Sequence, residues 1–170
     1  MSERPPRWAL FGTALAAVIF IGGVLVYVPY ILSRWRVAPP FLGFEPVRWV
    51  GATAIALAVP VLGGFLVRFV REGHGTPMPL APPQRLVTGG VFRYVRNPGY
   101  LAALAAIVGQ GLVFGSTSVL IYAAGMAIAF HLFVVLVEEP ALSRTFGPDY
   151  AAYCRQVRRW LPRRPDGESR

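Results

Sequence analysis

Residues 99–137, GYLAALAAIVGQGLVFGSTSVLIYAAGMAIAFHLFVVLV, contain no Asp, Glu, Lys or Arg. Within this run only Gly115, Ser116 and Thr117 form a polar, turn-prone break. At ~1.5 Å per residue, each side of the break approaches the ~30 Å thickness of a bilayer's hydrocarbon core. The run therefore predicts a tight helical hairpin of two membrane spans, over residues 99–117 and 118–137.

Two further apolar blocks precede the hairpin. Residues 8–32 are free of charge, and this block is longer than the ~7–15 apolar residues of a signal peptide. Residues 49–70 form the other block, with Arg68 near an end from which its side chain reaches the headgroups. Pro29 and Pro60 are tolerable there because neighbouring helices can satisfy the freed carbonyls. We expect an all-α integral membrane helical bundle of four spans with a cytoplasmic interfacial helical tail.

The composition agrees with this fold class. The chain is 55% apolar and 15% charged, whereas soluble domains are nearer ~45–50% and ~25%. All 17 basic residues are arginines, which flank the apolar blocks, so a membrane role is favoured over nucleic-acid binding despite the net charge of +9. The absence of lysine beside abundant Ala, Gly, Pro and Arg suggests a GC-rich bacterial genome and hence a bacterial inner membrane. Cys154 is the single cysteine, so no internal disulfide is expected.

The arginine distribution predicts the orientation. With four spans, three arginines (Arg34, Arg36 and Arg48) lie on one side and the other fourteen on the opposite side. The positive-inside rule then places both termini in the cytoplasm. We expect three parts: residues 1–70 with two spans, residues 71–98 as a cytoplasmic Gly/Pro-rich loop, and residues 99–170 with the hairpin and tail.

The tail after Glu139 predicts two short amphipathic helices. Gly147 and Pro148 break the chain between them, and Pro162 ends the second. Apolar residues of the second helix share a face at helical spacing, which predicts a helix along the cytoplasmic interface. These residues are Tyr150, Tyr153, Val157, Trp160 and Leu161.

The hairpin brings two polar groups of residues to the same depth. One precedes the third span: Arg93, Tyr94, Arg96, Asn97 and Tyr100; the other, Glu138 and Glu139, follows the fourth. One interpretation is a topology anchor of interfacial arginines and tyrosines, which composition alone favours. Against it, ionisable residues at the end of an apolar span are costly and are candidates for function.

These residues also carry a family resemblance. The run Arg93-Tyr-Val-Arg-Asn-Pro-Gly-Tyr100 resembles the Arg-His/Asn-Pro-x-Tyr motif of membrane methyltransferases, which include isoprenylcysteine carboxyl methyltransferase and phosphatidylethanolamine N-methyltransferase. A second set of residues resembles the carboxyl-terminal signature of the isoprenylcysteine branch: Glu138-Glu139-Pro-x-Leu142, Phe146-Gly-x-x-Tyr150-x-x-Tyr153, Val157 and Leu161-Pro162. Asn97 stands where the isoprenylcysteine branch usually has His. In having Asn, the chain resembles the phospholipid branch instead, so the acceptor stays open.

The resemblance implies an S-adenosylmethionine site at the cytoplasmic face. The cofactor's sulfonium, hydroxyls and zwitterionic end need carboxylates, an aromatic wall and a cation. Glu138 or Glu139 would bind hydroxyls or the amine, Tyr100 the ring or sulfonium, and Arg93, Arg96 or Arg144 the carboxylate. The expected catalytic residues are Glu138, Glu139 and Arg144. The expected cofactor-binding residues are Arg93, Arg96, Asn97, Pro98, Tyr100, His131, Glu138, Glu139 and Tyr150.

Several alternatives stay open at this point. His131 lies seven residues before Glu138 and therefore points either into the site or, equally well, to a neighbouring span. Gly109 and Gly111 favour close helix packing over a ligand loop. The scattered histidines and Cys154 predict no metal. The acceptor is either a prenylcysteine-like carboxylate or a phospholipid amine, and the rival functions are a small transporter and a non-catalytic membrane adaptor.

Overall fold

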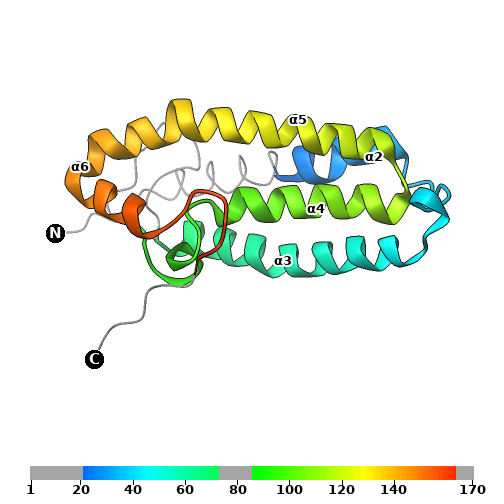
Figure 1. The fold of residues 1–170 in the computed structure, drawn as a ribbon, viewed down its shortest axis with the longest axis horizontal. Coiled ribbons are helices and arrows are strands. Elements are labelled where there is room, and N and C mark those ends of the chain that lie inside the picture. Colours follow the sequence, from blue (N-terminus) through cyan, green and yellow to red (C-terminus); the bar gives the residue numbers. More distant parts are fainter. Residues whose placement is uncertain (1–20, 73–85, 164–170) are drawn as a thin grey trace.

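The computed structural model describes residues 21–72 and 86–163, except the side chains of Leu42 and of residues 65–72. The elements described there are all helical, and they form a bundle elongated along the helix axes (Figure 1). In chain order they are η1 (Gly23–Tyr27), α2 (Val28–Ser33), η2 (Phe41–Gly43), α3 (Pro46–Glu72), η3 (Gly90–Arg93), α4 (Pro98–Phe114), α5 (Thr117–Phe133), η4 (Val134–Glu138) and α6 (Glu139–Gln156).

The expected hairpin is present as α4 and α5. Gly115 ends α4 with a φ of 64°, a conformation that glycine adopts without steric cost. Ser116 begins α5, because its hydroxyl accepts a hydrogen bond from the backbone N–H of Val119. The α5 helix then continues through the π-helical η4 into α6 without a break, so the polar residues of α6 follow directly on the apolar run.

Within the described residues, two helices are long and apolar enough to cross a membrane. One window, Pro46–Gly64, lies in α3, and the other, Thr117–Gln156, covers the continuous run from α5 into α6. The remaining apolar helices, Gly23–Ser33 and Pro98–Phe114, are shorter as described. Residues 8–20 of the expected first span and residues 73–85 of the Gly/Pro-rich loop lie outside the described residues.

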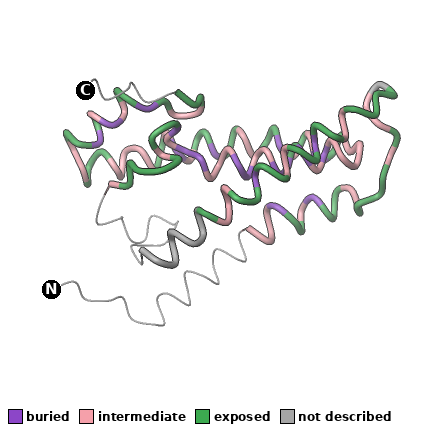
Figure 2. Tube along the Cα trace, turned by 90° about the horizontal axis from the view of Figure 1, so that it is seen from below, coloured by how far each residue is buried: buried purple, intermediate pink, exposed green. Residues whose placement is uncertain are grey.

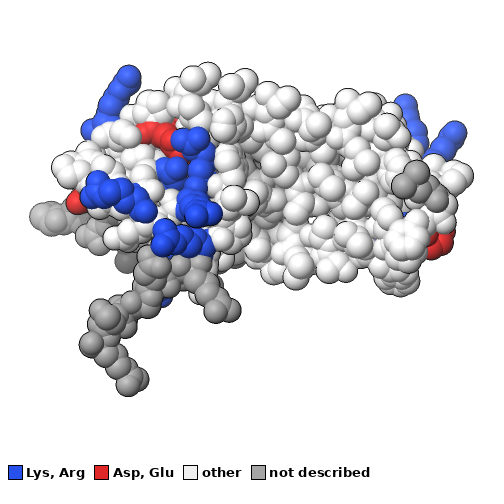
Figure 3. Space-filling model, viewed as in Figure 1, with Lys and Arg blue, Asp and Glu red and all other residues white. Residues whose placement is uncertain are grey.

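Charged side chains gather at the two ends of the bundle (Figure 3). At one end, Arg34, Arg36, Glu45 and Arg48 lie in or beside the segment between α2 and α3. The other end carries the arginines around α4's first turn, Glu138, Glu139 and the tail. Between them the visible surface is uncharged, as expected of helices that face lipid.

The close packing of α3 against α4 depends on two glycines. A Cβ at Gly109 would lie 2.6 Å from the backbone oxygen of Gly51, and a Cβ at Gly51 would lie 2.6 Å from that of Gly109. On its other side, α4 packs Gly111 against Leu120 of α5. The interpretation of Gly109 and Gly111 as packing positions is therefore confirmed, and α4 lies between α3 and α5 (Figure 1).

Pro29 shows how a proline is accommodated in this bundle. Its missing N–H frees a carbonyl one turn earlier, and η1 is π-helical just there. Gln110 of α4 donates to the oxygen of Leu25 at 2.9 Å, and the Tyr122 hydroxyl of α5 donates to that of Val24 at 3.1 Å. Neighbouring helices thus satisfy these carbonyls, as expected from the sequence, and the contacts hold η1 and α2 against the hairpin.

The tail differs from expectation beyond Gln156. The break at Gly147 is confirmed, since its φ of 47° and ψ of −118° divide α6 into two helical parts. The second helix ends at Gln156, however, and Val157 is extended, so Trp160 and Leu161 do not continue a helical face. The physical reason is that the chain beyond Val157 pairs through its backbone with the stretch before α4: Arg96 N–H donates to the oxygen of Arg158, and Arg163 N–H donates to that of Tyr94. The chain therefore turns back onto the bundle (Figure 2), with Tyr150, Tyr153 and Val157 buried against Leu86.

We predict that Gly109→Ala destabilises the protein by about 1–3 kcal/mol, because the added methyl group forces α3 and α4 apart. Thermal unfolding in detergent measures the effect. Gly125→Ala in α5 is the matched control, since a Cβ there meets nothing within 4 Å and the position is exposed. Equal melting temperatures for the two variants would contradict the close-packed crossing.

Candidate active site

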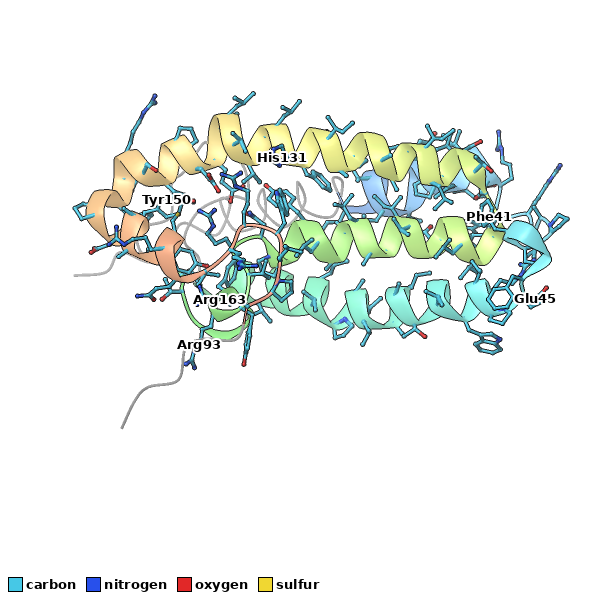
Figure 4. All side chains as sticks on the ribbon, viewed as in Figure 1. Phe41, Glu45, Arg93, His131, Tyr150 and Arg163 are labelled. Atoms are coloured by element: carbon cyan, nitrogen blue, oxygen red, sulfur yellow. The ribbon has the colours of Figure 1, made fainter. Side chains whose placement is uncertain are left out.

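The polar residues of three chain segments meet at one end of the bundle (Figure 4). The segments are the stretch entering α4, the junction of η4 with α6, and residues 157–163, which we call the strap. The strap follows α6 and runs back across the start of α4. Two backbone hydrogen bonds attach it there: Arg96 N–H donates to the oxygen of Arg158, and Arg163 N–H donates to that of Tyr94.

Glu139 lies at the centre of this meeting point. Arg159 of the strap donates to both of its carboxylate oxygens, from Nε and from a terminal nitrogen, each at 2.7 Å. Arg96 lies 3.2 Å from the same carboxylate and also donates to the Sγ of Cys154. The hydrogen bonds that Arg159 donates to Glu139 raise the pKa of the Arg159 guanidinium. Among the described residues, the buried Nε of Arg96 has no hydrogen-bond partner.

Glu138 faces a different partner. The Tyr100 hydroxyl donates to its carboxylate at 3.0 Å, and the Tyr100 ring packs against Phe130 with ring centroids 4.9 Å apart. Glu138 is the last residue of η4 and Glu139 the first residue of α6, and π-helical turns inside α-helices occur frequently at functional sites. The adjacent carboxylates thereby bind separate groups, one an aromatic hydroxyl and the other two guanidinium groups.

Asn97 binds the strap through its side chain. It is 7% exposed, and its side-chain nitrogen donates to the backbone oxygen of Arg159 at 3.2 Å. Pro98 occupies the first position of α4, where its missing N–H costs nothing. The Asn-Pro pair therefore does two local tasks: it starts α4 and holds the strap.

His131 has a different environment from the one that an uninterrupted α-helix would give it. The Nε1–H of Trp160 donates to its Nδ1 at 3.1 Å, and the imidazole is exposed (Figure 4). The wider turn of η4 changes the helical phase between His131 and Glu138, so spacing by seven residues no longer places them in register. His131 contacts the strap, while Glu138 contacts α4.

The remaining site candidates divide into two groups. Tyr150 is buried at the foot of the cluster, beside Tyr153. Arg93 and Arg144 are exposed, and in the part of the chain that is described no hydrogen bond or ion pair joins them to either glutamate. The same residues contain no group of three or more His, Cys, Asp or Glu that would hold a metal ion.

Sequence reasoning did not place four residues of this cluster at the site, although it named Tyr153 and Trp160 on the apolar face of the tail. Arg159 and Cys154 contact Glu139 and Arg96, Trp160 contacts His131, and the Tyr153 hydroxyl donates to the oxygen of Phe92 at 2.8 Å. The only signal for Arg159 is its charge, which complements Glu139. No spacing rule links the two, because the connection passes through the kink at Gly147 and the extended strap.

The model of the family described as phospholipid methyltransferase matches residues 51–149. The chain belongs to this phospholipid methyltransferase family. Its membership confirms the resemblance to membrane methyltransferases, supports an enzymatic function and, with the two apolar helices, indicates a membrane protein. The matched region includes Arg96, Asn97, Tyr100 and both glutamates, whereas the strap lies beyond it.

A curated relative extends the comparison. The chain is 30% identical over 141 residues to the cobalt-zinc-cadmium resistance protein CzcN of Cupriavidus metallidurans. The alignment covers 78% of this chain and 63% of the relative, so this chain spans under two thirds of that protein's length. No solved structure matches this member of the family.

We predict that Asn97→Ala destabilises the strap, because the part-buried hydrogen bond to the backbone oxygen of Arg159 is lost at a cost of about 1 kcal/mol. Thermal unfolding and limited proteolysis after Arg158 or Arg159 measure the change. Thr145→Ala is the control, since it removes an exposed side-chain hydrogen bond to Ala141 and should stay within ~0.5 kcal/mol. Equal protease resistance in both variants would show that Asn97 does not hold the strap.

Proposed function

We propose that this protein transfers a methyl group from S-adenosylmethionine to an amphiphilic acceptor that partitions into the membrane. The observation that carries the proposal is the pair of contacts joining the two family motifs, Tyr100 with Glu138 and Arg96 with Glu139. Family membership supplies the reaction class. The contacts put carboxylates, guanidinium groups and aromatic rings at one end of the bundle.

The chemistry of this cluster fits the cofactor. The unpartnered Nε of Arg96 is a donor for a carboxylate, and Arg96 directly precedes the Asn97-Pro98 pair that begins α4. Tyr100, packed on Phe130, offers an aromatic face beside the Glu138 carboxylate, an environment that favours a cation such as a sulfonium. His131 and Tyr150 complete the proposed lining, and Arg93 is the alternative carboxylate ligand.

When bound, S-adenosylmethionine supplies an electrophilic methyl group. The chain's own residues then have two tasks, to hold the acceptor in line and to manage its proton. Holding the acceptor in a near-attack position accounts for much of the rate in such a displacement. For a phospholipid amine, Glu138 is the base that takes the proton, whereas a prenylcysteine-type carboxylate needs only an arginine, for which we propose the exposed Arg144.

The membrane arrangement belongs to the same proposal. The bundle has four spans in a bacterial inner membrane, with both termini and the strap in the cytoplasm. This arrangement places the cluster at the cytoplasmic headgroup level. An acceptor then reaches Glu138 from the bilayer, and exposed arginines beside the strap attract anionic headgroups at ~1 kcal/mol each.

The rival functions need other features. A proton-coupled transporter needs an acidic residue near the middle of a span. The described spans hold Glu138 and Glu139 only where the apolar run ends, and Glu45 lies just before α3. A non-catalytic adaptor would keep the fold without binding the cofactor, so cofactor binding separates it from the enzyme.

We predict that the purified protein in lipid transfers labelled methyl groups from S-adenosylmethionine to a lipid extract, and that Glu138→Gln lowers kcat/KM at least tenfold. The basis is a charge-assisted interaction worth about 1.5–3 kcal/mol. Glu45→Gln, which removes a carboxylate at the opposite end of the bundle, is the matched control and should keep full activity. Label found only in water-soluble acceptors, or equal activity of the two variants, would refute the proposal.

We also predict the orientation of the bundle from labelling of single cysteines in a Cys154→Ser background. In intact cells a non-permeant maleimide should modify Val37→Cys and leave Leu161→Cys unlabelled until the membrane is permeabilised. Both positions are well exposed, at 67% and 64%, so accessibility does not differ within the fold. The reverse labelling pattern would overturn the proposed topology.

A further inference from the structure

We infer that Arg159 of the strap is a positioning residue: it fixes Glu139, and Glu139 in turn holds Arg96 ready for the carboxylate at the amino-acid end of the cofactor. The inference rests on the proposed function and assigns a role to residues beyond the family match, which ends at residue 149. Under this inference Arg96 would touch the cofactor, whereas Arg159 acts through Glu139.

The first argument is the geometry around Glu139. Arg159 bonds both carboxylate oxygens at 2.7 Å, and this two-point contact fixes the plane as well as the position of the carboxylate. The oxygen that accepts from Nε of Arg159 is also the one that lies 3.2 Å from Arg96. The position of Arg159 therefore constrains the position of Arg96 through the shared carboxylate oxygen of Glu139.

The second argument is the state of Arg96. Its side chain is 12% exposed, with one terminal nitrogen shared between Glu139 and Cys154 and with its Nε buried and unpaired within the described part of the chain. The single carboxylate of Glu139 pairs with the guanidinium groups of both Arg96 and Arg159. This triad of Arg96, Glu139 and Arg159 therefore carries a net positive charge. A ligand carboxylate supplies both what Nε needs as an acceptor and the negative charge that the triad lacks.

The third argument is that Arg159 is held independently of its side chain. Its backbone oxygen accepts from Asn97, the preceding residue accepts from the backbone of Arg96, and the following residue, Trp160, donates to His131. The strap therefore stays attached when the Arg159 side chain is altered, and a substitution there acts mainly on Glu139 and Arg96.

The test compares S-adenosylmethionine with its decarboxylated analogue, which lacks only the carboxylate. Each is titrated into the full-length protein in lipid nanodiscs. We expect the wild type to prefer S-adenosylmethionine at least tenfold and Arg159→Gln to reduce this preference to threefold or less. Arg159→Lys, which keeps the charge but not the two-point contact, should give an intermediate ratio. Arg158→Gln, at an exposed neighbouring position, should keep the wild-type ratio.

The ratio separates positioning from a general loss of structure. If Arg159→Gln weakens both ligands equally, or neither, Arg159 does not act on the carboxylate and the inference fails while the proposed function stands. If the wild type binds neither ligand, the proposed function itself fails. Should Arg159→Gln not fold, the lysine variant decides: an unchanged preference overturns the inference and a reduced one supports it.

Discussion

The carboxylate of Glu139, held between Arg96 and Arg159, joins the three segments on which the polar end of the molecule depends. Arg96 comes from the stretch before α4, Glu139 from the start of α6 and Arg159 from the strap. Removing one partner of this partly buried set leaves uncompensated charge on the others. The ion pairs therefore define the position of the Glu139 carboxylate and which atoms of Arg96 remain available, while backbone oxygens and N–H groups hold the strap itself.

The apolar part of the bundle supports this arrangement through contacts of backbone with backbone and of side chain with backbone. The glycines at the crossing of α3 and α4 let the helix axes approach, and Gln110 and Tyr122 bind carbonyls of η1. These contacts fix α4 and α5 relative to each other and to the first described helix. Because the two helices of the hairpin are fixed relative to each other, Tyr100 of α4 lies within hydrogen-bond distance of Glu138.

The sequence predicted the features that depend on local pattern. Charge-free runs indicated α4 and α5, Gly115 indicated their turn, and the adjacent glutamates with the Asn-Pro-x-Tyr segment indicated the cluster. Two features depend on distant partners and had no such signal. The π-helical η4 shifts His131 out of register with Glu138, and the strap is extended where its backbone bonds to Tyr94 and Arg96. Arg159 consequently looked like one basic residue among many in the tail.

The most direct measurement of the central claim is an experimental structure of the protein in lipid with S-adenosylhomocysteine, the product that methyl transfer leaves. The account predicts density for this ligand at the polar end, with its amino-acid carboxylate on Arg96 and its sulfur near Tyr100 and Glu138. Clear density at the opposite end, beside Arg48, or at the polar end with Arg96 still bound only to Glu139 and Cys154, would contradict it.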